Sequence, residues 1–232
     1  MAIDMTSGFL LGQGAREDEI KVRKVVTPSG RGVRGYFPSR KMGRMVAWES
    51  LLERDAILLL EYSPAVIRYA EQPTRVNFLH DGKIRSYIPD FQAEIYNIGY
   101  IYVEVKPSAK LVAGSKIANR LDSITSHYRG TGIAFRVLTE KEVRRQPRLK
   151  NLQLLAYHAG RIHPATRQAR VDRLSVHEVD TIAGAMAVLG DLKLVYQLLA
   201  DGVYHCELDY PITLSTAIYR SVEGECHAPF HF

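Results

Sequence analysis

The stretch 88–107 constrains the fold of this chain more than any other part of the sequence. It reads Ile-Pro-Asp-Phe-Gln-Ala-Glu-Ile-Tyr-Asn-Ile-Gly-Tyr-Ile-Tyr-Val-Glu-Val-Lys-Pro. Apolar and polar residues alternate in both halves, which is typical of two β-strands with one buried face each. The sequence therefore predicts a β-hairpin with its loop at Asn97-Ile98-Gly99.

The predicted hairpin collects charged side chains on one face. With the loop at 97–99, Asp90 lies opposite Lys106 and Glu104 lies diagonal to Asp90. Side chains paired across two strands come within ~5 Å, so two carboxylates and an ammonium converge. A two-residue loop would shift the register and separate them. The plainer alternative is an Asp90–Lys106 salt bridge on a solvated face.

The spacing of Asp90, Glu104 and Lys106 also matches a known catalytic motif. Pro89-Asp90, a gap and then Glu104-Val105-Lys106 match the PD-(D/E)xK nuclease signature. Asp90 and Glu104 offer hard oxygen ligands that suit Mg²⁺ or Mn²⁺, and the Val105 carbonyl is a further candidate ligand. Lys106 can hold an attacking water and stabilise the charge that develops on a phosphate.

A predicted helix over 46–62 supplies a third acid. Glu49 and Glu53 lie four positions apart on the flank of its apolar stripe. A carboxylate bordered by apolar neighbours needs a partner, which is either an arginine or a metal ion. Glu53, with Glu49 as the lesser candidate, would complete a metal site from this helix.

The remaining pattern predicts an α/β domain followed by a mostly helical one. Short strands at Val66–Tyr69 and Arg75–Leu79, an Asp-Gly turn at 80–83, a helix at 115–128, a buried strand at Ile133–Leu138 and a helix from Thr139 are expected. Beyond them we expect helices near 150–158, 175–189 and 191–200, a strand at Val203–Leu208 and a short helix at 213–219. The predicted division is a tail at 1–15, a nuclease domain at 16–148 and a winged-helix-like domain at 149–232.

Charge is distributed unevenly along the chain. Residues 1–150 hold 25 Lys and Arg against 16 Asp and Glu, and residues 151–232 hold 6 against 9. The first part is suited to a polyanion and the second is not. A basic loop at 28–32 with flanking strands could contact DNA phosphates or form a solvated edge. The candidate DNA contacts are Arg31, Arg34, Arg40, Lys41 and Arg44.

Cysteine usage and hydropathy bear on the compartment. Cys206 and Cys226 suggest reduced thiols in a cytoplasmic protein. No signal peptide is expected, and no apolar run approaches the ~20 residues of a membrane helix. His205-Cys206 and Cys226-His227 do not have the spacing of a zinc finger.

Several further motifs, taken together, are similar to the TnsA-type endonucleases of heteromeric DNA transposases. The resemblance covers most of residues 20–145. It rests on Pro28-Ser29-Gly30-Arg31, Ser39 to Arg44, Ser50-Leu51-Leu52-Glu53, Leu59 to Tyr62, Glu71-Gln72-Pro73, Pro89-Asp90-Phe91, Glu104 to Pro107 and Thr139 to Glu142.

The resemblance implies a restriction-endonuclease-like fold and a metal-dependent cut of the 5′ strand at transposon ends, leaving a 5′-phosphate and a 3′-hydroxyl. It assigns Asp90, Lys106 and Glu53 to the active site, Glu53 because it lies eight positions before Glu61. Glu49 and Gln72 are secondary candidates. Some family members have Gln where this chain has Glu104, so metal preference is the property most affected.

The resemblance also implies Mg²⁺ as cofactor, with Mn²⁺ able to substitute. The expected partners are double-stranded DNA at transposon ends, a TnsB-type transposase and a TnsC-type AAA+ ATPase, and no membrane. Two alternatives stay open: a standalone PD-(D/E)xK nuclease of repair or restriction, and a non-catalytic DNA-binding scaffold with the same fold.

Overall fold

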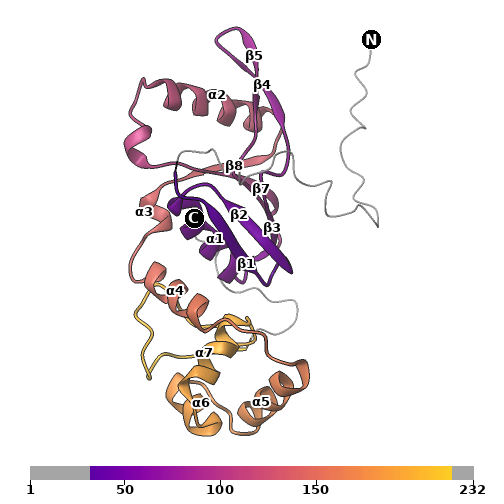
Figure 1. Cartoon of the computed structure of the whole chain (residues 1–232), viewed down its shortest axis with the longest axis vertical. Coiled ribbons are helices and arrows are strands. Elements are labelled where there is room, and N and C mark those ends of the chain that lie inside the picture. The colour runs from indigo at the N-terminus through magenta and orange to yellow at the C-terminus, as the bar shows by residue number, and fades with distance from the viewer. Residues whose placement is uncertain (1–31, 221–232) are drawn as a thin grey trace.

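A mixed four-stranded sheet lies at the centre of the structure, a computed structural model that describes residues 32–220 (Figure 1). Its strand order is β3 (Val66–Glu71), β6 (Phe91–Ile95), β7 (Gly99–Val105) and β8 (Ala134–Leu138). The first three run antiparallel and β8 runs parallel to β7. This mixed α/β architecture is consistent with the expected restriction-endonuclease-like fold.

The β6–β7 hairpin forms as predicted, but its register differs by two residues. Ile95 pairs with Gly99 and Phe91 with Val103, so the loop is 96–98 and not 97–99. Asn97 at φ 58° and Gly99 at φ 89° both have left-handed backbone conformations in this turn. Asp90 is therefore in line with Glu104 rather than Lys106. An even shift keeps every side chain on its own face, so the predicted charged face survives the error.

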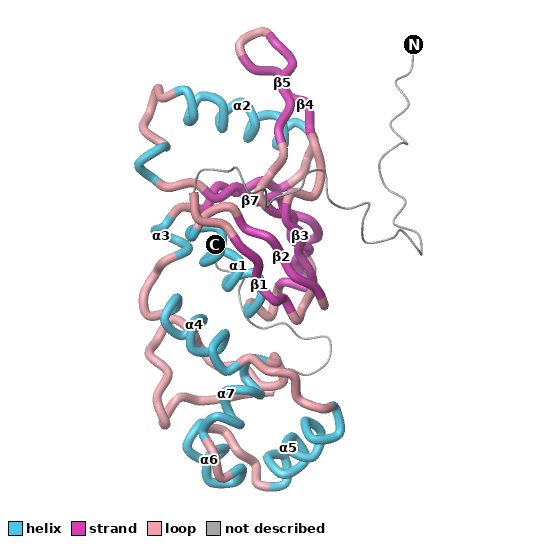
Figure 2. The backbone as a smooth tube through the Cα atoms, viewed as in Figure 1, coloured by secondary structure: helices cyan, strands magenta, loops and turns pink. Residues whose placement is uncertain are grey.

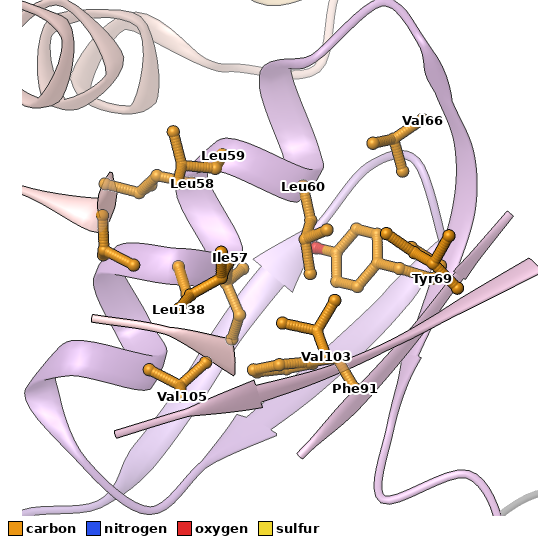
Figure 3. Packing of buried hydrophobic residues seen from close by; sticks show 14 of the residues in the cluster. Ile57, Leu58, Leu59, Leu60, Val66, Tyr69, Phe91, Val103, Val105 and Leu138 are labelled. Atoms are coloured by element: carbon orange, nitrogen blue, oxygen red, sulfur yellow. The ribbon is translucent and has the colours of Figure 1, made fainter. Parts of the chain in front are cut away.

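One face of the sheet packs against α1 (Leu51–Tyr62). Strand residues Phe91, Ala93, Val103 and Val105 are almost fully buried. Figure 3 shows Ile57 and Leu60 of α1 lying over Phe91, Val103 and Val105. The alternation of buried and half-buried residues along β6 is the one that the sequence predicts.

Helix α1 starts later than expected, so the prediction of a helix over 46–62 is wrong at its N-terminus. Val46 to Trp48 belong to β2 (Arg44–Trp48), which pairs with β1 (Gly35–Ser39). The Ser50 hydroxyl accepts a hydrogen bond from the Glu53 backbone N–H at 3.1 Å and caps the helix. Ser50-x-x-Glu53 is the spacing of a capping box, a start signal that overrides apolar periodicity upstream. Glu49 therefore precedes the helix.

The opposite face of the sheet carries α2 (Lys116–Gly130) and a second hairpin, β4 (Val76–His80) with β5 (Lys83–Tyr87), which we call the arm (residues 76–87). Asp81 and Gly82 have positive φ angles, as the predicted Asp-Gly turn requires. Phe78 and Tyr87 of the arm pack with Leu121, Ile124 and Tyr128 of α2. Figure 1 shows the arm projecting beyond the sheet beside α2.

Strand β8 is less buried than predicted. Only Leu138 is buried, and Ala134 and Arg136 are exposed, because β7 is the one strand that pairs with β8 among the described residues. It leads into the short helix α3 (Glu140–Val143), which Thr139 and Glu142 start with a capping box. The 3₁₀ turn Ser108–Lys110 connects β7 with α2.

The C-terminal part consists of α4 (Arg148–His158), α5 (Pro164–Val176), α6 (Ile182–Leu189) and α7 (Leu192–Ala200). These helices gather at the end of the molecule opposite the arm (Figure 2). The predicted single helix at 175–189 is wrong. Glu178 has φ 47°, and the Thr181 hydroxyl accepts from the Gly184 backbone N–H at 3.3 Å to start α6 afresh. Helix α5 was not predicted, although Pro164 at its first position is a start signal.

Two further predictions in this part are wrong. Residues 203–208 form no strand and residues 213–219 form no helix. Their backbone groups form isolated antiparallel bridges instead, His205 with Tyr219 and Thr181 with Ala217. The Ile218 N–H donates to the Asp180 carbonyl at 2.8 Å, a partner far away in the sequence that local pattern cannot reveal.

Helix α4 lies between the two main hydrophobic clusters. Leu149 and Leu152 belong to the cluster under the sheet, and Leu155 belongs to the cluster of α5–α7. The predicted boundary at 148/149 and the winged-helix-like character of 149–232 stay predictions. The predicted tail at 1–15 lies outside the described residues.

Within residues 32–220, no single helix is long and apolar enough to cross a membrane; the bent pair α6 and α7, 117° apart, meets the length and composition criteria only jointly.

Candidate active site

Asp90, Glu104 and Lys106 come together where β7 ends. The Lys106 ammonium lies 2.6 Å from Glu104 Oε1 and 3.4 Å from Asp90 Oδ2. All three side chains are on the face of the sheet opposite α1, the face that carries Gln92 and Tyr102. The structure thus brings together the charged group that the alternating pattern predicts.

Burial and mutual repulsion shape the acidity of this group. Burial, and then the neighbouring Glu104 carboxylate, raise the pKa of Asp90 to about 7. Burial alone would lower the pKa of Lys106, but Asp90 and Glu104 together raise it above its ordinary value. Lys106 is therefore an ammonium at neutral pH, and it partly neutralises two crowded carboxylates.

Each carboxylate has a further partner that fixes its position. The Val105 backbone N–H donates to Asp90 Oδ2 at 2.8 Å. The hydroxyl of Tyr87, at the base of the arm, donates to Glu104 Oε2. Burial, followed by Glu104, raises the pKa of Tyr87, so its hydroxyl remains a donor. Tyr87 was not predicted as a site residue, because its strand pairs with β4 and meets β7 only in the folded chain.

Glu53 lies near this group but is turned toward its own helix. Its carboxylate accepts from the Glu49 backbone N–H at 2.7 Å and from the Ser50 hydroxyl at 3.0 Å. Burial, and then Asp90, raise the pKa of Glu53 to about 7. The Asp90 charge therefore affects the pKa of Glu53, while the Glu53 carboxylate oxygens are bound at the N-terminus of α1.

A cleft of about 580 Å³ opens in front of Asp90, Glu104 and Lys106. Glu49 and Gln72, both secondary candidates, line it, whereas Glu53 does not. The Gln72 side chain is buried, and its Oε1 has no hydrogen-bond partner among the described residues. The Gln72 backbone N–H donates to the Asp90 carbonyl at 2.9 Å, which ties the end of β3 to the site. An orphaned amide oxygen in a cleft wall is a group suited to an incoming ligand.

The cleft wall also carries four basic side chains that were not predicted from the sequence. Arg75, Lys110, Lys116 and Arg120 line it. Lys116 and Arg120 lie four positions apart on one helix face, and that spacing is the signal that could have identified them. Arg75 comes from the segment just before the arm and Lys110 from the β7–α2 connection, so tertiary structure alone assembles the set.

The structure uses three of the predicted DNA contacts internally. Arg44 pairs with Glu71 at 2.8 Å, and Lys41 donates to the Leu60 and Ser63 carbonyls at 2.9 and 2.8 Å. Arg40 pairs with Asp201 of the C-terminal part. Arg34 is among the described residues but not in the cleft wall, and Arg31 lies outside the described residues.

The donor set is compatible with a hard divalent cation but incomplete as it stands. No group of three or more His, Cys, Asp or Glu side chains within residues 32–220 is arranged to hold a metal ion. Asp90 and Glu104 both contact Lys106, and burial followed by the Glu104 charge raises the pKa of Asp90 to about 7, as expected for two crowded carboxylates. Asp90 and Glu104, with the Gln72 amide oxygen nearby, are oxygen donors of the type that Mg²⁺ prefers.

Cys206 does not line the cleft at Asp90, Glu104 and Lys106. Cys206 is a buried free thiol whose pKa burial raises to about 11. Cys226 and His227 lie outside the described residues.

Comparison with known families places the candidate site inside a matched segment. Residues 63–140 match the family described as TnsA-like endonuclease N terminal. Asp90, Glu104, Lys106 and Gln72 all lie within this TnsA-like segment, together with the arm and α2. Glu49 and Glu53 precede it. The comparison with curated proteins found no match to the chain.

Proposed function

We propose that this chain is a metal-dependent DNA endonuclease that cuts the 5′ strand at transposon ends as a subunit of a heteromeric transposase. The match to the TnsA-like endonuclease domain supports a nuclease related to transposition. The observation that carries the proposal is the meeting of Asp90, Glu104 and Lys106 in a cleft with a basic wall, inside the matched segment.

The proposed reaction is hydrolysis of one phosphodiester bond. A water oxygen forms a bond to phosphorus, the bond from phosphorus to the 3′ oxygen breaks, and that oxygen takes up a proton. The products are a 5′-phosphate and a 3′-hydroxyl. Mg²⁺ or Mn²⁺ held by Asp90 and Glu104, with Glu53 and the Val105 carbonyl as further candidates, would supply Lewis-acid chemistry.

Lys106 acts as a charged donor in this proposal and not as a base. Its raised pKa keeps the ammonium protonated at neutral pH. An ammonium aimed at the phosphate stabilises the negative charge that develops on its oxygens during attack. Tyr87 and the Val105 N–H hold Glu104 and Asp90 in position for the same step.

The proposed partners follow from the family resemblance and from charge. They are double-stranded DNA at transposon ends, a TnsB-type transposase that cuts the other strand, and a TnsC-type ATPase. Residues 151–232, with 6 basic against 9 acidic side chains, suit a protein partner better than DNA. A cytoplasmic location is part of the same proposal.

A strand-resolved cleavage assay on a transposon-end duplex, with the partner transposase present, tests the proposal. Asp90→Ala and Lys106→Ala should each reduce 5′-strand cutting by about 10²–10³-fold, the usual effect of losing one transition-state contact. Omission of Mg²⁺ should abolish the cut and Mn²⁺ should restore it. Asp122→Asn and Lys193→Met, which alter exposed charges on α2 and α7, are the matched controls.

Two results would overturn the proposal. If both Asp90→Ala and Lys106→Ala cut normally, the chain is not the nuclease and the remaining interpretation is a non-catalytic DNA-binding scaffold. Robust cutting of arbitrary duplex by the chain alone would identify a standalone nuclease of the repair or restriction type.

The third acid requires a comparison of its own. Glu53→Gln should lower cutting more than Glu49→Gln if Glu53 turns from its helix cap toward a bound cation. The opposite order would assign the role to Glu49, which already lines the cleft.

A further inference from the structure

We propose that the arm and the first half of α2 form a basic channel that holds consecutive backbone phosphates of DNA on one side of the scissile bond. This inference rests on the proposed nuclease function and names where its substrate lies. It assigns a binding role to the channel residues Arg85, Lys116 and Arg120.

A second cleft, of about 540 Å³, continues from the candidate active site. Its wall is formed by His80, Asp81, Arg85, Ser86, Lys116, Asn119 and Arg120. Ser86, Lys116 and Arg120 line both clefts. A strand that enters at Asp90 and Lys106 can therefore continue past these shared residues, along the surface that the arm and α2 form together.

The charge of this path fits a polyanion. The lining of the second cleft contains three basic residues, Arg85, Lys116 and Arg120. It contains one acidic residue, Asp81, which lies at the turn of the arm. Arg75 and Lys110 add positive charge where the path meets the active site. Phosphates bind to such a row of basic side chains with release of counterions, independently of base sequence.

Several contacts hold the walls of the channel in position before any ligand arrives. Arg120 Nη2 donates to the Ser86 carbonyl at 3.2 Å, and its guanidinium lies 5.9 Å from the centre of the Phe78 ring. His80 Nδ1 and the Ser123 hydroxyl lie 3.0 Å apart, which joins the arm tip to α2. A preformed channel loses less side-chain entropy on binding than a mobile one.

The length of the arm sets the size of the footprint. Each of its strands has 5 residues. At about 3.4 Å per residue the arm is roughly 17 Å long, and phosphates of one strand recur every ~3.4 Å along a DNA axis. The channel should therefore cover roughly five nucleotides beside the cut.

Salt-dependent binding of the full chain to a labelled transposon-end duplex in EDTA tests this inference without cleavage. Arg85→Gln/Lys116→Gln should reduce the slope of log K against log salt by about 1.8, because each lost phosphate contact removes about 0.9. Arg129→Gln/Arg136→Gln removes two exposed positive charges from the far end of α2 and from β8, and it should leave the slope unchanged. Far-UV circular dichroism melts verify that both variants fold.

Phosphate-ethylation interference supplies the second readout. Wild-type binding should be blocked by modification of roughly five consecutive phosphates on one side of the cut, and the Arg85→Gln/Lys116→Gln variant should lose this pattern. Equal losses of slope in both double variants, or interference spread along the duplex, would overturn the channel.

The outcomes separate this inference from the proposed function. An inactive Asp90→Ala variant together with an unchanged slope for Arg85→Gln/Lys116→Gln refutes the channel alone. Normal cutting by Asp90→Ala and Lys106→Ala refutes the nuclease, even if the slope falls as expected.

Discussion

The acidic pair Asp90 and Glu104 is held together against its own repulsion. Lys106 offsets part of that repulsion, and hydrogen bonds from Val105 and Tyr87 fix the two carboxylates. Such an arrangement costs stability in the absence of a cation, since buried like charges disfavour each other. Stability measurements can therefore detect the site without any activity assay.

Replacement of Asp90 by Asn should stabilise the metal-free protein at neutral pH. The pKa of Asp90 rises from 3.8 to about 7 on folding, so between these values the folded form holds a proton that the unfolded chain has released. Stability of the wild type must then fall as pH rises through this window. The unfolding free energy of Asp90→Asn should exceed that of the wild type by an amount that grows between pH 4 and pH 7. This difference should reach at least about 1 kcal/mol and stay constant above pH 7.

Urea unfolding in EDTA at several pH values measures this difference. Asp122→Asn, on an exposed part of α2, serves as the control and should show no such trend. A pH-independent difference for Asp90→Asn would mean that Asp90 is ionised throughout.

Replacing Gln72 should raise the stability of the protein and lower its activity, as expected for a buried polar group that serves function rather than folding. Its Oε1 is buried without a partner among the described residues, and such an atom costs about 1–3 kcal/mol in desolvation. Gln72→Met, nearly isosteric, should raise the unfolding free energy by about 1 kcal/mol and lower strand cutting at least tenfold. If Gln72→Met is less stable than the wild type but fully active, the Gln72 side-chain amide has a structural role and not a functional one.

Residue pattern alone predicts most of the acidic site and little of its surroundings. Alternation puts Asp90, Glu104 and Lys106 on one face, and this holds for any even register. The observed register accompanies left-handed conformations at Asn97 and Gly99, and residue alternation does not specify which residues of the turn adopt them. Tyr87 reaches the site from the arm and Arg75 from the segment just before it, so their roles depend on tertiary packing that no local pattern contains.

At the scale of elements, the start of α1 decides where Glu53 points. Ser50 caps the helix and holds one Glu53 oxygen, and the Glu49 backbone N–H holds the other. Ser50 and Glu49, directly before the first turn of α1, therefore keep a candidate metal ligand away from the cleft. The predicted longer helix would have given Glu49 and Glu53 equivalent orientations.

Ser50→Ala tests this coupling between cap and site. Loss of an N-cap side chain should cost about 1 kcal/mol of unfolding free energy. The Ser50 hydrogen bond lowers the pKa of Glu53, so the pKa should rise further in the variant. Carboxyl-detected NMR titration measures it, and Ser50→Thr, which keeps a hydroxyl, should restore both values. An unchanged Glu53 titration would show that the cap does not hold its carboxylate.

Elements with strong local signals are the ones that the sequence predicts well. The Asp-Gly turn of the arm and α2 form where expected, and the β6–β7 hairpin forms with its register shifted by two residues. The failures at 203–208 and 213–219 involve backbone partners far away in the sequence, such as Asp180 for Ile218. Local propensity cannot anticipate those partners.

At the scale of the whole molecule, α4 connects the sheet core to the C-terminal helices. Its apolar residues divide between the two main clusters. Arg148 at its start makes two 2.6 Å hydrogen bonds to Asp209, and the Asn151 amide donates to the Leu208 and Tyr210 carbonyls at 2.9 and 2.7 Å. These contacts fasten the last described segment onto α4.

A double-mutant cycle on Arg148 and Asp209 should reveal how strongly this junction holds. Arg148→Met leaves Asp209 partly buried without its main partner and should cost about 2–4 kcal/mol. Combining it with Asp209→Leu should recover part of that loss, with a coupling energy of at least about 1 kcal/mol. Two probes report the unfolding of the two parts. Fluorescence of Trp48, the single tryptophan, reports the sheet and its core, and far-UV circular dichroism reports the helices. A coupling energy near zero would mean that apolar packing alone holds the junction.

The β6–β7 hairpin has a consequence for the order in which the protein assembles. Asp90 and Glu104 are joined by a short loop, whereas the parallel partner β8 is reached only after the chain has passed through α2. Contacts between residues close in sequence form faster, because less chain entropy is lost in closing them. We therefore expect the two carboxylates to meet early in refolding, before β8 docks, with amides of β6 and β7 gaining hydrogen-exchange protection ahead of those in β8.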